Sequence, residues 1–201
     1  MDRLLVEVFD KRLDPSLRDE FLATCEAYRF DEVLGTYKPY RQVIADATRR
    51  AACRYAIAFE DHDAELLYAA VPTWGPHPGV ADALTTLGMK HKLVILTNAA
   101  DEQIMDNVDQ LRASFHAVFT AEQAQAYKPR LAAFEYMLEQ LGCSPAEIVH
   151  VSSSPMYDLR PAHDLGIRQT VLLNRGYEPS QPWIGYREIQ SLPELVTVLN
   201  G

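Results

Sequence analysis

Residues 93–98, LVILTN, contain the pattern on which the fold prediction depends, an apolar run that ends in two polar residues. The pattern recurs at residues 148–154, IVHVSSS, where apolar residues lead into hydroxyl side chains. A helical pattern over residues 130–141 lies between them and stops at Gly142, a residue typical of helix ends. Strands that alternate with helices predict an α/β fold, a parallel sheet flanked by helices.

The amino-terminal part of the chain has a different pattern. From residue 14 to about residue 71 it reads as successive helices with alanine-rich stretches and no convincing strand. Residues 71–80, VPTWGPHPGV, contain three prolines and two glycines, which is typical of a linker. We therefore predict a small helical domain over residues 14–74, and an α/β core made of residues 1–13 and 75–201.

Composition narrows the classes of partner. The chain has 201 residues, 48% hydrophobic and 23% charged, as in ordinary globular proteins. A net charge of -9 argues against nucleic acid, whose phosphates attract clustered Lys and Arg. The sequence has neither a long apolar run nor a leader pattern, so we expect no membrane partner. Three scattered cysteines read as small buried hydrophobes in a reducing compartment, and we expect a cytoplasmic protein.

Short polar motifs follow the apolar runs. They are Thr97-Asn98, Tyr127-Lys128-Pro129, and the serines 152–154 with Asp158. In parallel sheets the loops after the strands converge on one crevice, so hydroxyl, amide, ammonium and carboxylate groups would meet there. Such a crevice is suited to a small anion.

Each motif also has a plainer structural interpretation. Thr97 and Asn98 would cap the following helix. Lys128 would be a solvated loop residue. Asp158 would be the N-cap of a helix that begins near Leu159.

In this order and context the motifs resemble the haloacid dehalogenase (HAD) superfamily, most closely its L-2-haloacid dehalogenase (type II) branch. Residues 93–98 are similar to the second family motif, 121–142 to the third with its Tyr-Lys-Pro, and 148–167 to the fourth. The resemblance covers residues 37–175. It implies a Rossmann-like core with a helical cap, and a hydrolase that removes halide from short 2-haloacids through an aspartyl ester.

The resemblance also implies roles for single residues. Lys128 and Asp158 would be catalytic, with Lys128 neutralising a nucleophilic carboxylate and Asp158 orienting Lys128 or the hydrolytic water. Substrate-binding residues would be Thr97, Asn98, Ser153 and Ser154. Arg41, in the YKPYR stretch, is a further candidate that would reach over the site from the cap.

The family's first motif, which supplies the nucleophilic aspartate, has no clean copy here. Residues 30–36, FDEVLGT, imitate it with one extra residue. Residues 4–10, LLVEVFD, have the form of a strand followed by an aspartate, which makes Asp10 a candidate nucleophile.

A third interpretation is favoured. The apolar residues of segment 4–13 share one helical face, as expected of a helix that follows the first motif, so the nucleophile would precede residue 1. Loss of the central strand would expose strand edges. Either residues 4–9 would replace that strand, or a partner chain would cover the gap.

One carboxylate, Asp158, among serines makes a poor magnesium site, because Mg²⁺ prefers several oxygen ligands. We therefore expect a mechanism without metal or other cofactor, acting on a small anionic 2-haloacid. Two alternatives stay open, a catalytically silent relative that lacks the nucleophile and a superfamily phosphatase. The resemblance also implies a possible homodimer.

Overall fold

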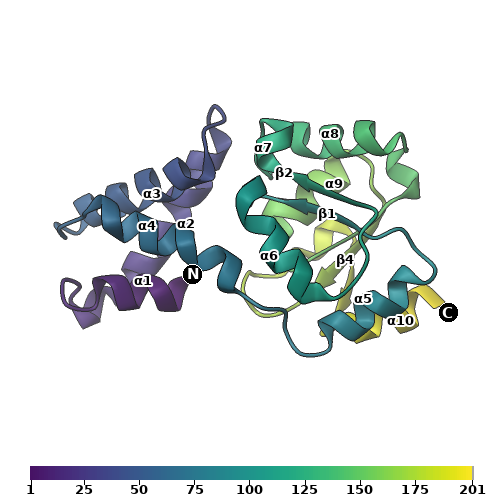
Figure 1. Ribbon diagram of the computed structural model, residues 1–201, viewed down its shortest axis with the longest axis horizontal. Helices are drawn as coiled ribbons and strands as arrows, with labels where there is room; N and C mark the ends of the chain where they lie inside the picture. The colour runs from purple at the N-terminus through teal and green to yellow at the C-terminus, as the bar shows by residue number, and fades with distance from the viewer. Residues whose placement is uncertain (201) are drawn as a thin grey trace. The chain divides into compact units, whose positions relative to one another are not determined.

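The computed structural model describes residues 1–200, and the chain divides into two compact units, Met1–Trp74 and Gly75–Gly201 (Figure 1). We call them the helical unit and the α/β unit. The division falls inside the proline- and glycine-rich stretch. The elements of the helical unit are α1 (Asp2–Phe9), the 3-10 turn η1 (Pro15–Leu17), α2 (Arg18–Leu34), α3 (Tyr40–Arg54), α4 (Asp61–Ala70) and η2 (Val71–Thr73).

Residues 4–9 belong to a helix, so the interpretation of this segment as a strand is wrong. Leu5, Phe9 and Leu13 are buried, as a stripe with helical spacing should be. The Phe9 ring meets the Phe21 ring of α2 edge-on, with 5.3 Å between ring centroids. The interpretation as one apolar helical face is confirmed.

The assignment of residues 1–13 to the α/β core is likewise corrected, because this segment packs within the helical unit. Arg12 donates to both carboxylate oxygens of Asp63 in α4, at 2.7 and 2.9 Å. A bidentate pair of this kind, together with the buried stripe of α1, fixes the segment to α2 and α4.

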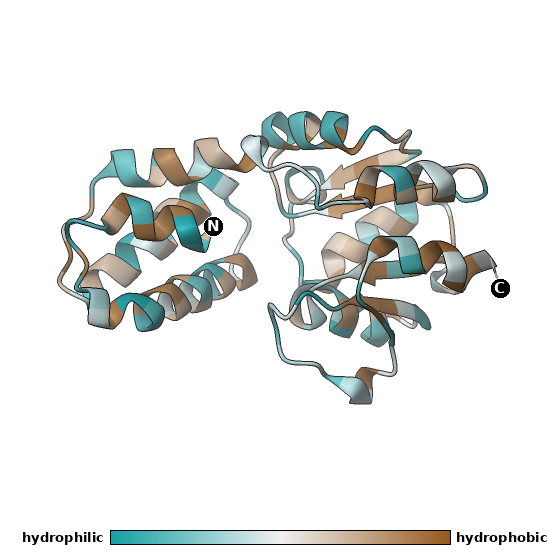
Figure 2. Cartoon of the chain, turned by 90° about the horizontal axis from the view of Figure 1, so that it is seen from below, coloured by the Kyte–Doolittle hydropathy of each residue, from teal (hydrophilic) through white to brown (hydrophobic). Residues whose placement is uncertain are grey.

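The α/β unit alternates strands and helices, and all its strand pairs are parallel, which confirms the predicted fold class. In Figure 2 its strands have the brown colour of apolar residues. The elements are α5 (Val80–Gly88), β1 (Val94–Thr97), α6 (Asp101–Leu111), β2 (Ala117–Thr120), α7 (Ala121–Ala124), α8 (Leu131–Leu141), η3 (Pro145–Glu147), β3 (Val149–Ser152), the π-helical turn η4 (Pro155–Leu159), α9 (Arg160–Asp164), β4 (Gln169–Leu173), η5 (Pro182–Ile184), β5 (Arg187–Ile189) and α10 (Leu192–Asn200).

The strands form two separate sheets, although one continuous sheet was expected. β1 pairs with β2, in the register Val94 to Ala117. β3, β4 and β5 form the second sheet in that order, with Val149 opposite Gln169 and Val171 opposite Arg187. Within residues 1–200, β1 and β3 therefore each have one edge that pairs with no other strand.

Two apolar clusters cover the two faces of these strands. Leu87 of α5 and Leu195 of α10 pack on Val171 of β4, and α5 and α10 lie side by side (Figure 1). Phe134 of α8 packs on the other face, with Phe119 of β2. No helix among the described residues combines the length and apolar character that a membrane span needs.

Free cysteines occur in both units. Cys25 is buried as expected, whereas Cys53 is exposed, so its interpretation as a buried hydrophobe is wrong.

Candidate functional site

Lys128 lies in the short loop between α7 and α8, and its backbone is held from the end of β1. The Asn98 side-chain amide accepts from the Lys128 backbone N–H at 2.8 Å and donates to its carbonyl at 2.9 Å. Tyr127, the preceding residue, is buried, and the Lys128–Pro129 peptide bond is cis. Asn98 thus positions the lysine rather than capping a helix.

The Lys128 ammonium reaches toward the ends of β1 and β3. It donates to Oδ1 of Asp158 at 2.8 Å and to the backbone carbonyl of Leu96 at 2.9 Å. The side chain is 13% exposed, so the alternative of a solvated loop lysine is excluded. An ammonium has three N–H donors, and these two bonds leave one for a further acceptor.

Asp158 is the buried partner of this lysine. Its Oδ1 also accepts from Nε2 of His150 at 3.0 Å; since an ionised carboxylate only accepts, Nε2 carries the proton. Burial alone would raise the pKa of Asp158, but the Lys128 ammonium and the His150 hydrogen bond together outweigh it and hold this pKa well below its usual value. Asp158 is therefore an anion at neutral pH.

His150 also belongs to this cluster, although it was not among the candidate site residues of the sequence analysis. Its ring lies edge-on to Phe134 of α8, with centroids 5.3 Å apart, which fixes the direction of Nε2. The signal was present in the sequence: Val149 and Val151 point to one face of the strand, so His150 points to the other, toward Asp158.

The serines after β3 shape the turn that carries Asp158. The Ser154 hydroxyl accepts from the Tyr157 N–H at 2.9 Å and is the N-cap of η4. The Ser152 hydroxyl accepts from the Ser154 N–H at 3.1 Å. The interpretation of Asp158 as the N-cap of a helix that begins near Leu159 is therefore wrong, because Ser154 is the N-cap of η4 and Leu159 that of α9.

Two further predicted substrate contacts lie nearby. The Thr97 hydroxyl accepts from the Ala99 N–H at 3.1 Å, and as a hydroxyl it can still donate. Ser153 is half-buried, with no hydrogen-bond partner for its hydroxyl among the described residues.

Asp10 and Arg41 belong to the helical unit. Asp10 is an exposed residue just after α1, not at the end of a strand. Arg41 forms an ion pair with Glu65, and its guanidinium lies 4.3 Å from the centre of the Tyr68 ring. The structure therefore gives the positions of Asp10 and Arg41 relative to the helical unit alone.

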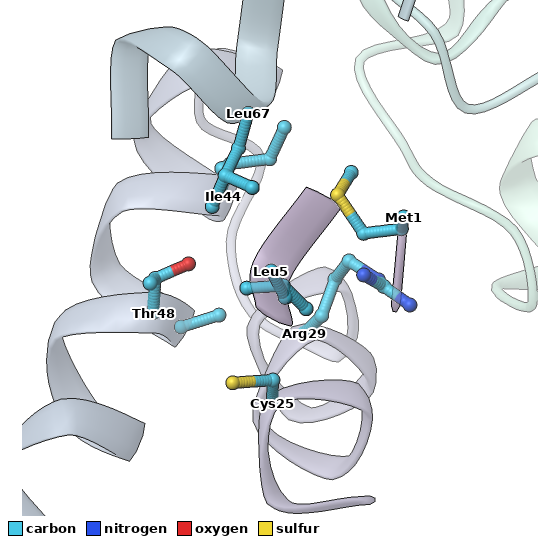
Figure 3. A pocket seen from close by; sticks show the side chains of 8 residues that line it. Met1, Leu5, Cys25, Arg29, Ile44, Thr48 and Leu67 are labelled. Atoms are coloured by element: carbon cyan, nitrogen blue, oxygen red, sulfur yellow. The ribbon is translucent and has the colours of Figure 1, made fainter. Parts of the chain in front are cut away.

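A cavity of about 810 Å³ lies in the α/β unit between β1 and β3, and Lys128, His150 and Asp158 line it. Its volume is in the range of ligand-binding sites. The helical unit has a cavity of only about 10 Å³, beside Leu5, Cys25 and other side chains of its core (Figure 3).

The small cavity is no candidate site. It has room for one water at most. Burial raises the pKa of the Cys25 thiol to about 12, so Cys25 is not a reactive thiolate at neutral pH.

Metal ligands are sparse near the large cavity. Among residues 1–200, no three His, Cys, Asp or Glu side chains are grouped so that they could hold a metal ion. Oδ1 of Asp158 is already occupied by an ammonium and an imidazole.

Comparisons with known proteins identify the family of the chain. A family model described as haloacid dehalogenase-like hydrolase matches residues 8–172. Haloacetate dehalogenase H-2 of Moraxella sp. (strain B) is 29% identical over 146 residues, 71% of this chain and 64% of that protein. Glyceraldehyde 3-phosphate phosphatase of Methanocaldococcus jannaschii is 29% identical over 131 residues, 63% of this chain and 57% of that protein.

The matches thus span less than two thirds of either relative. Among solved structures, L-2-haloacid dehalogenase from Xanthobacter autotrophicus, with chloropropionic acid covalently bound, has a TM-score of 0.77 at 18% identity. That match covers 100% of this chain and 93% of the dehalogenase. At such identity it is the fold that is shared.

Proposed function

Because the chain belongs to the haloacid dehalogenase-like hydrolase family, we propose that it hydrolyses the carbon–halogen bond of short 2-haloacids. The observation that carries the proposal is the ammonium of Lys128, held between Asp158 and the end of β1 with one N–H left for an anion. Haloacetate dehalogenase and L-2-haloacid dehalogenase are among the similar proteins.

The proposed reaction has two steps. A carboxylate oxygen attacks C2 of the substrate; the new C–O bond forms while the carbon–halogen bond breaks, and halide leaves with the bonding electrons. Water then attacks the ester carbonyl, which releases the 2-hydroxyacid and a proton and restores the carboxylate. Covalent catalysis of this kind divides one difficult displacement into two easier steps.

In this mechanism Lys128 stabilises the negative charge of the carboxylate and of the 2-haloacid. Asp158 keeps the ammonium in place, and because its pKa is depressed it orients groups rather than accepting a proton. Asn98 positions the lysine loop. Thr97, Ser153 and Ser154 stay predicted contacts of the substrate or halide.

No residue is yet assigned as the source of the attacking carboxylate. Asp10 is the candidate from the sequence. Under the proposal the helical unit is the cap domain, and Arg41 is its predicted substrate contact. A cytoplasmic location and a homodimer also stay predictions.

A phosphatase is the competing function, since a phosphatase is among the relatives. The donor set disfavours it. Phosphoryl transfer by this family would need Mg²⁺ on several oxygen ligands, and the turn after β3 offers serines with a single carboxylate already paired to Lys128.

The test is halide release from (S)-2-chloropropionate without added metal, by the chain and by its Lys128→Met, Asp10→Asn and Lys11→Met variants. Lys128→Met should lower the rate by about 100-fold or more, since it removes a preorganised charge. The exposed Lys11→Met is the matched control and should leave the rate unchanged. A rate abolished by Asp10→Asn would assign Asp10 as the nucleophile.

The opposite outcomes are equally clear. Phosphate release that requires Mg²⁺, without halide release, would make the chain a phosphatase. A folded chain that releases neither product would be the catalytically silent relative.

A further inference from the structure

We infer that His150 is a positioning residue of the candidate site, which directs the Lys128 ammonium by holding the carboxylate of Asp158. Its effect on the reaction rests on the proposed function, whereas its effect on the direction of the ammonium does not. The inference follows from what holds each of the two acceptors of this ammonium, the Leu96 carbonyl and Oδ1 of Asp158.

Lys128 needs both acceptors, because its backbone does not determine where its ammonium points. Asn98 holds the backbone N–H and the carbonyl of Lys128. A flexible four-carbon stem lies between this backbone and the ammonium. The third N–H of the ammonium, which would meet the anion, is therefore directed by the acceptors of the other two.

The two acceptors are held in different ways. The Leu96 carbonyl belongs to β1, whose pairing with β2 fixes it. The carboxylate of Asp158 belongs to a side chain, and the torsion that turns it is broad and roughly two-fold. Apart from Lys128 itself, the one described residue that bonds to this carboxylate is His150. Without His150, only the ammonium would orient the carboxylate that is supposed to orient it.

Both hydrogen bonds to this carboxylate go to the same oxygen. Oδ1 of Asp158 accepts from Lys128 at 2.8 Å and from His150 at 3.0 Å. Oδ2 accepts from none of the described residues. A carboxylate that turns would exchange Oδ1 for Oδ2 at the ammonium, and the bond from His150 opposes that exchange.

His150 is suited to this role because its own position is fixed. It lies in β3, where it is paired with Thr170 of β4. Its side chain is 12% exposed, and its ring packs edge-on against Phe134 of α8. Side chains on strands are positioned more precisely than those on loops. His150 thus extends the rigidity of the sheet to Lys128, which lies in a loop.

A purely structural role is the alternative. In that case His150 fills space beside Phe134, and its loss would weaken the fold without changing the direction of the ammonium. The two roles differ in what has to be kept. A structural role needs a ring of this shape, whereas a positioning role needs an N–H donor at the place of Nε2.

The first measurement is NMR spectroscopy without substrate. In the parent chain a long-range proton–nitrogen spectrum should show the His150 proton on Nε2, because an ionised carboxylate only accepts. The Lys128 ammonium should exchange at least about tenfold faster with water in His150→Phe than in the parent. His163→Phe is the matched control and should leave that exchange unchanged, because the His163 ring is also edge-on to an aromatic ring, that of Trp183, but bonds to neither Lys128 nor Asp158.

Halide release from (S)-2-chloropropionate is the second measurement. His150→Phe keeps an aromatic ring but loses the N–H, and kcat should fall about tenfold with KM within about twofold, as expected when an interaction of the transition state is misplaced. His150→Gln has an amide nitrogen as many bonds from Cβ as Nε2, and should restore kcat to within about threefold of the parent. His150→Asn, which is one carbon shorter, should be as slow as His150→Phe.

A double variant shows whether His150 acts through Lys128. Lys128→Met alone should lower the rate by about 100-fold. Lys128→Met/His150→Phe should be no slower, because the ammonium that His150 directs is already gone. Independent effects would multiply to about 1,000-fold.

Any of four results would overturn the inference. The first is a proton on Nδ1 of His150 in the parent chain, and this measurement needs no variant. The second is equal exchange of the Lys128 ammonium in the parent and in His150→Phe. The third is a His150→Gln variant as slow as His150→Asn, which would assign His150 a packing role. The fourth is multiplication of the two effects in the double variant.

The NMR measurement separates this inference from the proposed function. If the chain releases no halide, the proposed function fails, and the tautomer of His150 with the exchange of the Lys128 ammonium still decides the positioning role. Circular dichroism checks the fold of each variant. If His150→Phe does not fold, ammonium exchange and kcat in His150→Gln and His150→Asn decide the same question.

Discussion

Strands β4 and β1 are both rich in apolar residues, yet they have different surroundings. β4 pairs with β3 and β5, and residues 170–173 are buried. β1 pairs with β2 alone, and none of residues 94–97 is fully buried. Apolar composition thus predicts that both strands form, and of these two strands the one with a neighbour on each edge is the more deeply buried. The polar groups of the candidate site lie where the second neighbour is absent from the described residues.

We expect the largest effect from the ion pair between Lys128 and Asp158, which lies at the ends of β1 and β3. Asp158→Asn would leave the buried Lys128 ammonium without its anion, and breaking such a pair costs about 3–5 kcal/mol of unfolding free energy. Urea unfolding of the α/β unit, followed by Trp183 fluorescence in a Trp74→Phe background, measures it. Adding Lys128→Met should recover most of the loss, and a double variant no more stable than the single one would contradict this account.

The same variant has a pH signature. The folded pKa of Asp158 is lowered, so its contribution to stability is complete above the unfolded carboxyl pKa of about 4 and is lost as the pH falls below it. The parent chain should therefore lose stability from about pH 4 downward more steeply than Asp158→Asn. Parallel curves would show that this carboxylate is not an anion in the folded state.

A matched pair of core substitutions tests the comparison directly. Leu172→Ala removes a side chain of β4 that is 2% exposed, and we expect a loss of about 3 kcal/mol. Leu96→Ala removes the same atoms from half-buried β1, and about half that loss is expected, because less contact is removed. Equal losses would show that the open edge does not reduce packing.

The asparagines that follow the two strands give a smaller effect. Asn98→Ala removes two hydrogen bonds to the Lys128 backbone, at about 1 kcal/mol each, and should also lower halide release because the lysine loop loosens. Asn174, just after β4, bonds to Gly176 and Glu188 instead. Asn174→Ala should therefore affect stability by a similar or smaller amount and leave halide release unchanged.

The sequence predicts best those structural features that depend on residues close together in the chain. The strands of residues 93–98 and 148–154 and their parallel arrangement follow from local apolar runs and the helices between them, and the structure agrees. Membership of the dehalogenase-like family was also predictable, because three motifs agree in order. Lys128 and Asp158 were expected at one crevice, and they form an ion pair.

Contacts between residues that lie far apart in the sequence could not be predicted in the same way. Residues 4–9 are a short apolar run that is compatible with a strand or a helix, and in the structure they form a helix whose Phe9 packs against Phe21. His150 looks structural until the position of Asp158 is known. The division into two sheets could not be predicted either, because strand pairing joins residues that are far apart in the sequence.

The smallest effect concerns the turn between β3 and α9, where two adjacent serines differ only in their hydrogen bonds. Ser154 caps η4 through the Tyr157 N–H, and its replacement by Ala should cost about 1 kcal/mol. Ser153→Ala removes a hydroxyl that bonds to none of the described residues, so stability should not change. If Ser153 contacts the substrate, its variant should instead raise KM for the haloacid. An unchanged KM together with unchanged stability would remove Ser153 from the site and leave the open side of β3 with Asp158 and His150.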